Sequence, residues 1–166
     1  MALEAVKTRD AAPSDAAAIA TIYNQGIVDR IATLETEERT PEERRQWLAA
    51  RGPRHPVLVA ELDGTIVGWG SLNHFNPRKA YDFVADFSVY IARDWRGKGV
   101  GSALLRALIA RAKQLGYHKM VLSAFPWNTA GMALYQKYGF HTVGTYKEQG
   151  LLDGKWADTI VMEKIL

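Results

Sequence analysis

The sequence predicts an α/β domain in which helices cover both faces of a mixed sheet. Three observations support this prediction: short β-like runs alternate with segments of helical periodicity, Asp-Gly pairs join two pairs of runs into hairpins, and a glycine-rich turn separates a β-like run from a long helix. The length of 166 residues suits one hydrophobic core. Because neither an internal repeat nor a Pro/Gly-rich linker divides the chain, we expect a single domain over residues 1–166.

The composition excludes several classes of protein. Hydrophobic residues make up 48% and charged residues 23% of the chain, as in ordinary soluble domains. No apolar run approaches the roughly 18–20 residues of a membrane span, and the N-terminus lacks a signal-peptide pattern. The absence of cysteine excludes disulfides and thiol chemistry and fits a reducing compartment, so we expect a cytoplasmic location. A net charge of +3 is too small to indicate nucleic-acid binding but suits anionic small ligands.

The N-terminal half predicts a strand, two helices and a hairpin. In the first helix, apolar residues recur at helical spacing. The second helix begins with Thr40 as the N-cap, Pro41 at the first helical position and Glu43 closing a capping box. An Asp-Gly pair supplies the two-residue turn of the hairpin. In order, the strand, the helices and the hairpin are expected at residues 5–11, 13–27, 40–50 and 55–73.

The C-terminal half predicts a strand, a long helix, a buried strand, a short helix and a final pair of strands. Apolar residues recur on one face of the long helix, and Gly116 follows its end. Gly139 ends the short helix, and a second Asp-Gly pair turns the chain between the last two strands. The first four of these elements are expected at residues 83–91, 100–115, 119–124 and 128–138.

The turn "RGKGVGS" at residues 96–102 carries the main functional signal. Three alternate glycines indicate a backbone that bends tightly or approaches a ligand closely. A strand, a tight turn and a helix start together make an anion site, because unpaired N–H groups and the positive end of the helix dipole point at the ligand. The phosphate-binding loop of NTPases is excluded because Lys98 comes too early in the motif. A dinucleotide fingerprint fits poorly, because Ser102 replaces its last glycine and the next strand ends without an acidic residue.

The same turn resembles the R/Q-x-x-G-x-G/A signature of the GNAT N-acetyltransferase superfamily. A later segment, "WNTAGMALYQKYGF" at residues 127–140, resembles the family motif N-x-x-[AS]-x-x-[LM]-Y-x-K-x-G-F. The resemblance extends over nearly the whole chain. It implies a single-domain fold with a mostly antiparallel sheet of about seven strands, splayed between the fourth and the fifth. It also implies acetyl-CoA as the co-substrate.

The resemblance implies how the chain binds coenzyme A. The glycine turn is expected to hold the pyrophosphate, and main-chain groups of the strand before it are expected to pair with the pantetheine like an added strand. The alternative is a purely structural turn that lets strand and helix pack closely. The expected cofactor-binding residues are Val89, Tyr90, Ile91, Arg96, Gly97, Lys98, Gly99, Val100, Gly101, Ser102 and Asn128.

Acetyl transfer to an amine requires a base, an oxyanion donor and an acid. The resemblance implies a backbone N–H near Val89 as the donor and Tyr135 as the acid, because a neutral phenol can donate a proton. Asp86 is the candidate base. Relatives that acetylate phosphinothricin have Glu at the position of Asp86 and His at that of Tyr135, so the shorter carboxylate acts directly or through a water.

Other interpretations of these residues stay open. His74 is an alternative base, since its ordinary pKa is near neutrality. Asp86 also fits a solvated strand carboxylate, and Tyr135 also fits a core aromatic. No metal site is expected, because no ligand spacing links the remaining histidines, which are His55, His118 and His141.

The segment "NPRKAYDF" indicates the acceptor. It resembles the R-x-A-Y motif of the branch that acetylates phosphinothricin and methionine sulfoximine, and "DGKWAD" resembles the same branch's GKWxD. Arginine offers a planar, bidentate donor for a carboxylate, phosphinate or arsinate, and tyrosine adds another donor. The resemblance implies acetylation of the α-amine of a small acidic amino acid or analogue (phosphinothricin, methionine sulfoximine or sulfone, or arsinothricin) in detoxification or resistance. The expected substrate-binding residues are Arg78, Tyr81, Asn24, Thr33 and Leu34.

The sequence leaves other functions open. Within the same superfamily, the acceptor alternatives are protein N-termini and polyamines, although a polyamine enzyme is expected to carry acidic residues where this chain has Arg78. From a different class, a non-catalytic acyl-CoA-binding module keeps the same fold, and the presence of Tyr135 and Asp86 argues against it. Relatives of this branch pair through their later strands, so we expect a homodimer and neither a nucleic-acid nor a membrane partner.

Overall fold

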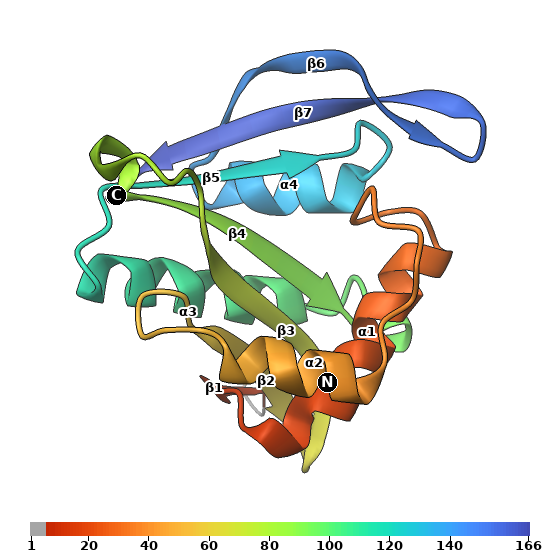
Figure 1. The fold of residues 1–166 in the computed structure, drawn as a ribbon, viewed down its shortest axis with the longest axis vertical. Helices are drawn as coiled ribbons and strands as arrows, with labels where there is room; N and C mark the ends of the chain where they lie inside the picture. The colour runs from red at the N-terminus through yellow and green to blue at the C-terminus, as the bar shows by residue number, and fades with distance from the viewer. Residues whose placement is uncertain (1–5) are drawn as a thin grey trace.

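The structure is a computed structural model that describes residues 6–166, so the first residue of the predicted strand 5–11 lies outside the described residues. Its strands are β1 Lys7–Asp10, β2 Val57–Leu62, β3 Thr65–His74, β4 Val84–Ile91, β5 Lys119–Ala124, β6 His141–Leu152 and β7 Lys155–Ile165. They form one sheet in the order β1-β2-β3-β4-β5-β7-β6 (Figure 1). All neighbouring strands are antiparallel except β4 and β5.

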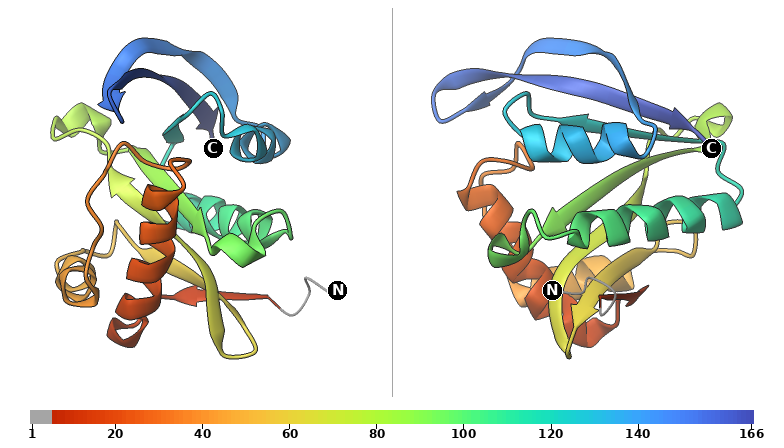
Figure 2. Two further views of the ribbon diagram at one scale, coloured as in Figure 1. Left: turned by 90° about the vertical axis from the view of Figure 1, so that its right-hand side faces the viewer. Right: turned by 180° about the vertical axis from the view of Figure 1, so that it is seen from behind.

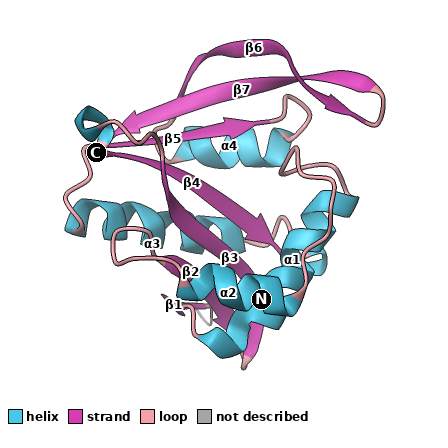
Figure 3. Cartoon of the chain, in the orientation of Figure 1, coloured by secondary structure: helices cyan, strands magenta, loops and turns pink. Residues whose placement is uncertain are grey.

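The helices are α1 Ala16–Val28, α2 Pro41–Ala49, α3 Val100–Gln114 and α4 Thr129–Lys137. In the left view of Figure 2, α1 and α2 lie on one side of the sheet and α3 and α4 on the other. Figure 3 shows the same arrangement by element type. The predicted α/β class and the predicted order of elements are therefore confirmed. Among residues 6–166, no helix combines the length and the apolar character needed to cross a bilayer.

The predicted helix starts are correct only in part. At the N-cap of α2, the Thr40 Oγ1 accepts a hydrogen bond of 3.1 Å from the Glu43 N–H, as expected. The Glu43 carboxylate, however, accepts bonds of 2.6 and 2.7 Å from the Arg44 guanidinium, so the reciprocal half of the predicted capping box is wrong. The helix predicted from residue 13 begins as a 3₁₀ turn, Pro13–Asp15, and becomes α-helical at Ala16.

The splay between the fourth and fifth strands is present. The parallel pairing of β4 with β5 runs only from Val84↔Lys119 to Asp86↔Val121. Beyond this point β4 stays paired with β3, and β5 stays paired with β7 to its end. Because a sheet leaves the backbone groups of an unpaired edge free, the half of β4 after Asp86 offers an open edge inside the molecule.

Two hydrophobic cores hold the helices to the sheet. The larger lies under α3, and its leucines Leu104, Leu105 and Leu108 are fully buried. A Cβ added at Gly70 on β3 would lie 2.8 Å from the Leu108 Cδ1, so α3 packs this closely only over a glycine. The smaller core lies under α1 and α2 and centres on Trp69, which stacks on Tyr90 with ring centroids 4.7 Å apart. These cores fix α1 and α3 on either side of the splay.

Candidate active site

A groove of about 420 Å³ lies at the splay, between α1 on one side and α3 and α4 on the other. Its walls come from the C-terminal half of α1, the free half of β4, the glycine turn, the start of α3 and one face of α4. The groove is lined by Ile22, Gly26, Ile31, Ala32, Val89, Tyr90, Ile91, Arg96, Gly97, Gly99, Gly101, Ser102, Asn128, Ala130, Gly131, Ala133, Leu134, Tyr135 and Lys137.

The glycine turn forms part of the wall of this groove. Gly97 has φ +73° and Gly99, the N-cap of α3, has φ +88°, which side-chain-bearing residues rarely adopt. A Cβ at Gly101 would lie 2.9 Å from the Leu134 Cδ2. No side chain caps α3, and its first internal bond runs from the Ala103 N–H to the Gly99 carbonyl. The first-turn N–H groups and the positive end of the α3 dipole are thus available to an anion.

A second, smaller pocket of about 220 Å³ lies on the other side of the sheet. An opening of about 50 Å³ between β4 and β5 shares residues with both the groove and this pocket. The groove and the pocket therefore adjoin this opening from its two sides, and we call the opening the passage. The smaller pocket is lined by Ala32, Thr33, Leu34, Asp86, Phe87, Ser88, Tyr90, Ser123, Ala124, Phe125 and Thr159.

Asp86 supplies the one carboxylate among the residues that line the smaller pocket. Burial raises the pKa of this carboxyl to about 6, and a hydrogen bond from the Asn73 amide (Nδ2 to Oδ2, 3.5 Å) opposes the rise. A carboxyl group with such a pKa exchanges its proton near neutral pH, which is the property required of a general base in this range.

Tyr135 borders the passage from the opposite side, on α4. Its ring is 8% exposed and packs against Phe87 and Phe140, with ring centroids 5.8 and 6.2 Å away. Burial raises the pKa of the phenol to about 12, so the hydroxyl keeps its proton at physiological pH. The passage thus has a proton donor at its groove side and a proton acceptor at its pocket side.

Comparison with known proteins identifies the family of this chain. The sequence model of the acetyltransferase (GNAT) family matches residues 21–140. The chain belongs to the GNAT acetyltransferase family.

Known relatives of this GNAT acetyltransferase match it over most of their length. The phosphinothricin N-acetyltransferase of Alcaligenes faecalis is 36% identical over 92% of this chain and 78% of its own. An L-methionine sulfoximine/L-methionine sulfone acetyltransferase of Pseudomonas paraeruginosa is 33% identical over 93% of this chain and 91% of its own. The crystal structure of a phosphinothricin acetyltransferase from Sinorhizobium meliloti in complex with acetyl-CoA superimposes with a TM-score of 0.91, at 30% identity over 98% of this chain and 89% of its own.

Most of the predicted cofactor residues of this acetyltransferase line the groove, and two do not. The Lys98 ammonium lies 5.3 Å from the centre of the Trp95 ring, and the Val100 side chain is fully buried in the core. Arg96 does line the groove, but its guanidinium pairs with Asp29 at 2.6 Å. In this structure the arginine side chain fastens the end of α1 to the glycine turn.

The predicted acceptor residues divide into three groups. Thr33 and Leu34 line the smaller pocket. Asn24 does not: its amide donates to the Arg39 carbonyl at 2.8 Å and accepts from the Arg39 N–H at 2.7 Å. Both polar atoms of Asn24 therefore hold the loop that carries Thr33 and Leu34, instead of facing the pocket. The third group is the pair of residues of the R-x-A-Y motif.

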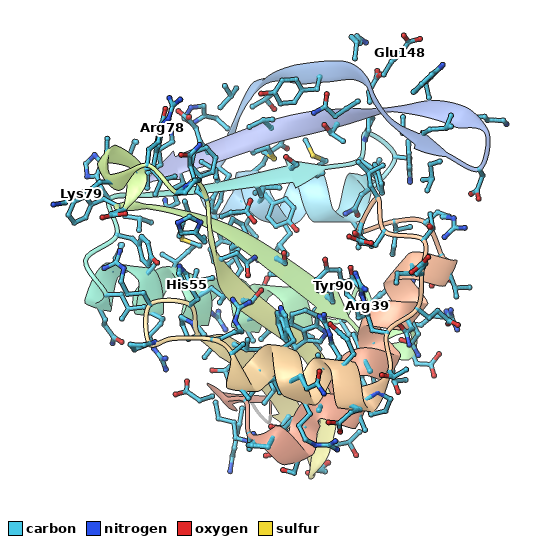
Figure 4. The ribbon with its side chains drawn as sticks, viewed as in Figure 1. Arg39, His55, Arg78, Lys79, Tyr90 and Glu148 are labelled. Carbon is cyan, nitrogen blue, oxygen red and sulfur yellow. The ribbon has the colours of Figure 1, made fainter. Side chains whose placement is uncertain are left out.

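Arg78 and Tyr81 lie outside the pocket lining. Arg78 is exposed and precedes a 3₁₀ turn, Lys79–Tyr81, while Tyr81 packs against Phe75 with ring centroids 5.5 Å apart. Figure 4 shows Arg78 and Lys79 near the start of β4, away from Tyr90 near its end. Two residues separate the 3₁₀ turn from β4, and Asp86 is the third residue of that strand. The exposed guanidinium thus stands beyond the Asp86 end of the pocket.

Three polar residues at the acceptor pocket were not predicted from the sequence. Ser123 and Thr159 bring hydroxyls to the pocket from β5 and β7, and Asn73 contacts Asp86 from β3. A strand pattern marks each of them only as a polar residue, because their meeting depends on the strand order. The alternative base His74 is exposed at the end of β3, outside the pocket lining, with its ring 5.8 Å from that of His55. Residues 6–166 contain no cluster of three or more potential metal-ligating side chains.

The glycine turn gives a first prediction. Gly99→Val forces a β-branched residue into φ +88°, and Gly101→Val places methyl groups against Leu134, so both variants should lose acetyl-CoA binding in calorimetry. Gly116→Val is the matched control, because Gly116 has φ +82° beyond the opposite end of α3 with no atom close to an added Cβ. The control should keep wild-type affinity. Unchanged affinity in both groove variants would contradict the anion site.

Asp86 gives a second prediction, on stability. Its folded-state pKa of about 6 exceeds the ordinary carboxyl value of about 3.9, so the folded state binds more protons between these pH values and stability falls as pH rises through the window. Asp86→Asn removes the buried charge. Urea unfolding should show the variant more stable than wild type by on the order of 2–3 kcal/mol at pH 8 and about equally stable at pH 4.

The matched control for this experiment is Asp158→Asn on β7. A hydrogen bond from the Glu148 N–H and one from Lys147 lower the pKa of Asp158, so its replacement should not stabilise the protein at pH 8. If Asp86→Asn is no more stable than wild type at pH 8, the Asp86 charge is not a buried one.

Proposed function

We propose that this acetyltransferase transfers the acetyl group of acetyl-CoA to the α-amino group of a small acidic amino acid or analogue. The candidate acceptors are phosphinothricin, methionine sulfoximine or sulfone, and arsinothricin. The observation that carries the proposal is the passage between the groove and a pocket of about 220 Å³ with Asp86 in its wall. The names of the relatives from Alcaligenes and Pseudomonas support this acceptor class.

The residues of the groove fit acetyl-CoA, which supplies the thioester-bound acetyl group. The first-turn N–H groups of α3 bind the pyrophosphate, and the glycines leave room for it to approach the backbone. The free edge of β4 at Val89–Ile91 pairs with the amide groups of the pantetheine arm. A backbone N–H near Val89 faces the oxygen on which negative charge develops during the transfer.

Asp86 and Tyr135 move the protons. Asp86, directly or through a water, takes a proton from the acceptor's ammonium group, which is mostly protonated near pH 7. The neutral amine forms the new N–C bond, the C–S bond breaks, and Tyr135 donates its phenolic proton to the departing sulfur. The second proton lost by the nitrogen restores the phenol. One proton per turnover leaves through Asp86, so the charges balance.

Arg78 and Tyr81 recognise the acidic group of the acceptor in this proposal. Both are exposed in the described structure, at the Asp86 end of the pocket, so the side chains are free to engage an anion that enters there. Polyamines fit the site less well, because the pocket lining holds one carboxylate where a polycation needs several.

We further propose that the protein works as a homodimer in the cytoplasm, in detoxification or resistance. Five large apolar side chains of the β6–β7 ribbon are more than half exposed, which supports a protein interface there. They are Val143, Tyr146, Leu151, Trp156 and Ile165. Light scattering of the purified protein decides the oligomeric state.

The role of Tyr135 gives a prediction on catalysis. Tyr135→Phe removes the proton donor with little change in volume, so kcat should fall by roughly 10²–10⁴-fold while acetyl-CoA affinity stays constant. Tyr138→Phe, one turn further along at the C-cap of α4 and outside the groove lining, is the control and should keep wild-type kcat. A wild-type rate in Tyr135→Phe would leave the residue as a packing aromatic.

The acceptor class is tested by a coenzyme A release assay over phosphinothricin, methionine sulfoximine, arsinothricin, polyamines and N-terminal peptides. Arg78→Ala should lower kcat/KM for the acidic amino acids by about 30-fold or more, because their anion loses a bidentate partner, and Arg78→Lys should recover only part. Lys79→Ala, the exposed neighbour, is the matched control. If wild type ignores all three acidic acceptors, or if Arg78→Ala matches wild type on them, the acceptor assignment fails.

A further inference from the structure

A fixed arginine lies behind the Asp86 side of the acceptor pocket. Arg51, two residues after α2, donates to the carbonyls of His55 and Leu72 at 2.8 and 2.6 Å. It also donates to the Oδ1 of Asn73 at 2.8 Å, and its guanidinium lies over the Trp47 ring at 4.4 Å from the centroid. Three acceptors and a ring face hold the guanidinium in one orientation, which an exposed arginine does not keep.

This arginine decides which way the Asn73 amide points. Because the Oδ1 of Asn73 accepts from Arg51, the Nδ2 must face the other way, toward the Asp86 Oδ2 at 3.5 Å and the Ser88 Oγ at 3.3 Å. The flipped amide would set its NH₂ against a guanidinium donor and its oxygen against a carboxylate. Asn73 stands directly opposite Asp86 in the β3–β4 register, so the strand pairing fixes the backbone of both residues.

We propose that Asn73, oriented by Arg51, is a positioning residue that holds the Asp86 carboxylate in its ionised, proton-accepting form and directs it into the acceptor pocket. This rests on the proposed function, in which Asp86 is the base. Burial alone favours the neutral acid, and a donor aimed at the carboxylate favours the ion. Asn73 therefore offsets part of the burial effect and keeps the carboxyl group ready to accept a proton near neutral pH.

The other groups around Asp86 do not duplicate this donor. Tyr90 is the titratable group beside it on β4, Tyr135 lies across the passage on α4, and burial raises the pKa of both phenols, so they stay neutral. Further along the sheet, Lys119 of β5 and Glu163 of β7 pair with each other at 2.6 Å. The remaining polar residues of the pocket are hydroxyls, namely Thr33, Ser88, Ser123 and Thr159. His74 follows Asn73 on β3, and its ring packs against His55.

The experiment measures the Asp86 pKa directly, by carbon NMR titration of the free protein, beside the pH profile of kcat/KM. Asn73→Leu keeps the volume but removes the donor, so the Asp86 pKa and the acidic limb of the profile should both move up by about 0.5–1 pH unit. Asn73→Asp keeps the acceptor for Arg51 but sets a second carboxylate beside Asp86, so both values should rise further. Asn73→Leu loses both the donor and the contact with Arg51, whereas Asn73→Asp loses only the donor. If the Asp86 pKa rises in both variants, the loss of the donor is the cause.

Two further variants test the chain of contacts. Arg51→Met frees the Asn73 amide and should raise the Asp86 pKa by less than Asn73→Leu, and Arg51→Lys should restore part of the shift. Asn76→Leu is the matched control, because the Asn76 side chain accepts from the Arg78 N–H at 3.0 Å and does not touch Asp86. It should leave the Asp86 pKa at its wild-type value. Circular dichroism and thermal unfolding verify that each variant is folded.

The possible outcomes separate the two assignments. An Asp86 pKa in folded Asn73→Leu equal to that of wild type overturns the positioning role, whatever the base is. A raised Asp86 pKa with an unmoved kinetic limb supports the contact with Asn73 but overturns Asp86 as the base. A parallel rise of the pKa and the limb, with kcat/KM at high pH little changed, supports both. A loss of activity that is equal at all pH values points to a merely structural asparagine and overturns the proposal.

Discussion

The parallel pairing of β4 with β5 stops after Asp86↔Val121, and the rest of the site depends on this one interruption. If β4 and β5 stayed paired along their whole length, the passage would close and the backbone groups of the β4 edge would be hydrogen-bonded to β5. Because β3 and β7 hold the outer sides of the two strands, the strands diverge without losing their other partners. The opening is therefore a stable part of the sheet, and the groove, the passage and the pocket adjoin one another along it.

The interruption also accounts for the electrostatics of the passage. Asp86 occupies the last position of β4 that pairs with β5, so its backbone is fixed by both neighbouring strands while its side chain lines the smaller pocket. The packing that encloses the passage raises the pKa of the carboxyl on one side and that of the Tyr135 phenol on the other. The two groups are thereby pushed toward opposite roles, since one exchanges protons near neutral pH and the other keeps its proton. The same burial makes the charged carboxylate a local source of instability.

The sequence allowed good prediction where the signal is local. The tight glycine turn before α3, where Gly99 has φ +88°, was predicted from a short stretch of sequence, and so were the Thr40 N-cap and the hairpin turns. The prediction failed where a side chain had a choice of partners. The Glu43 carboxylate pairs with Arg44 in place of the helix N-terminus. Asn24 was predicted in the acceptor site, but both polar atoms of its side chain bond to the backbone of a loop residue 15 positions away. A contact over this separation leaves no periodic pattern in the sequence, so the sequence did not predict it.

The cofactor groove and the acceptor pocket differ in how far their residues lie apart in the sequence. The part of the cofactor groove that offers the anion site comes from one continuous segment, the end of β4, the turn and the start of α3, so a short motif describes it, while α1 and α4 supply the remaining walls. The roof of the acceptor pocket is instead a loop held at several distant points: Arg30 pairs with Asp153 at 2.9 Å, its carbonyl accepts from the Trp127 indole at 2.7 Å, and Leu34 packs where Gly150 lacks a side chain. The β6–β7 hairpin therefore supports the loop over the acceptor pocket and takes no part in the anion site at the glycine turn. Changes in that hairpin can alter the acceptor pocket while the glycine motif stays intact. The glycine motif therefore predicts the co-substrate well and the acceptor poorly.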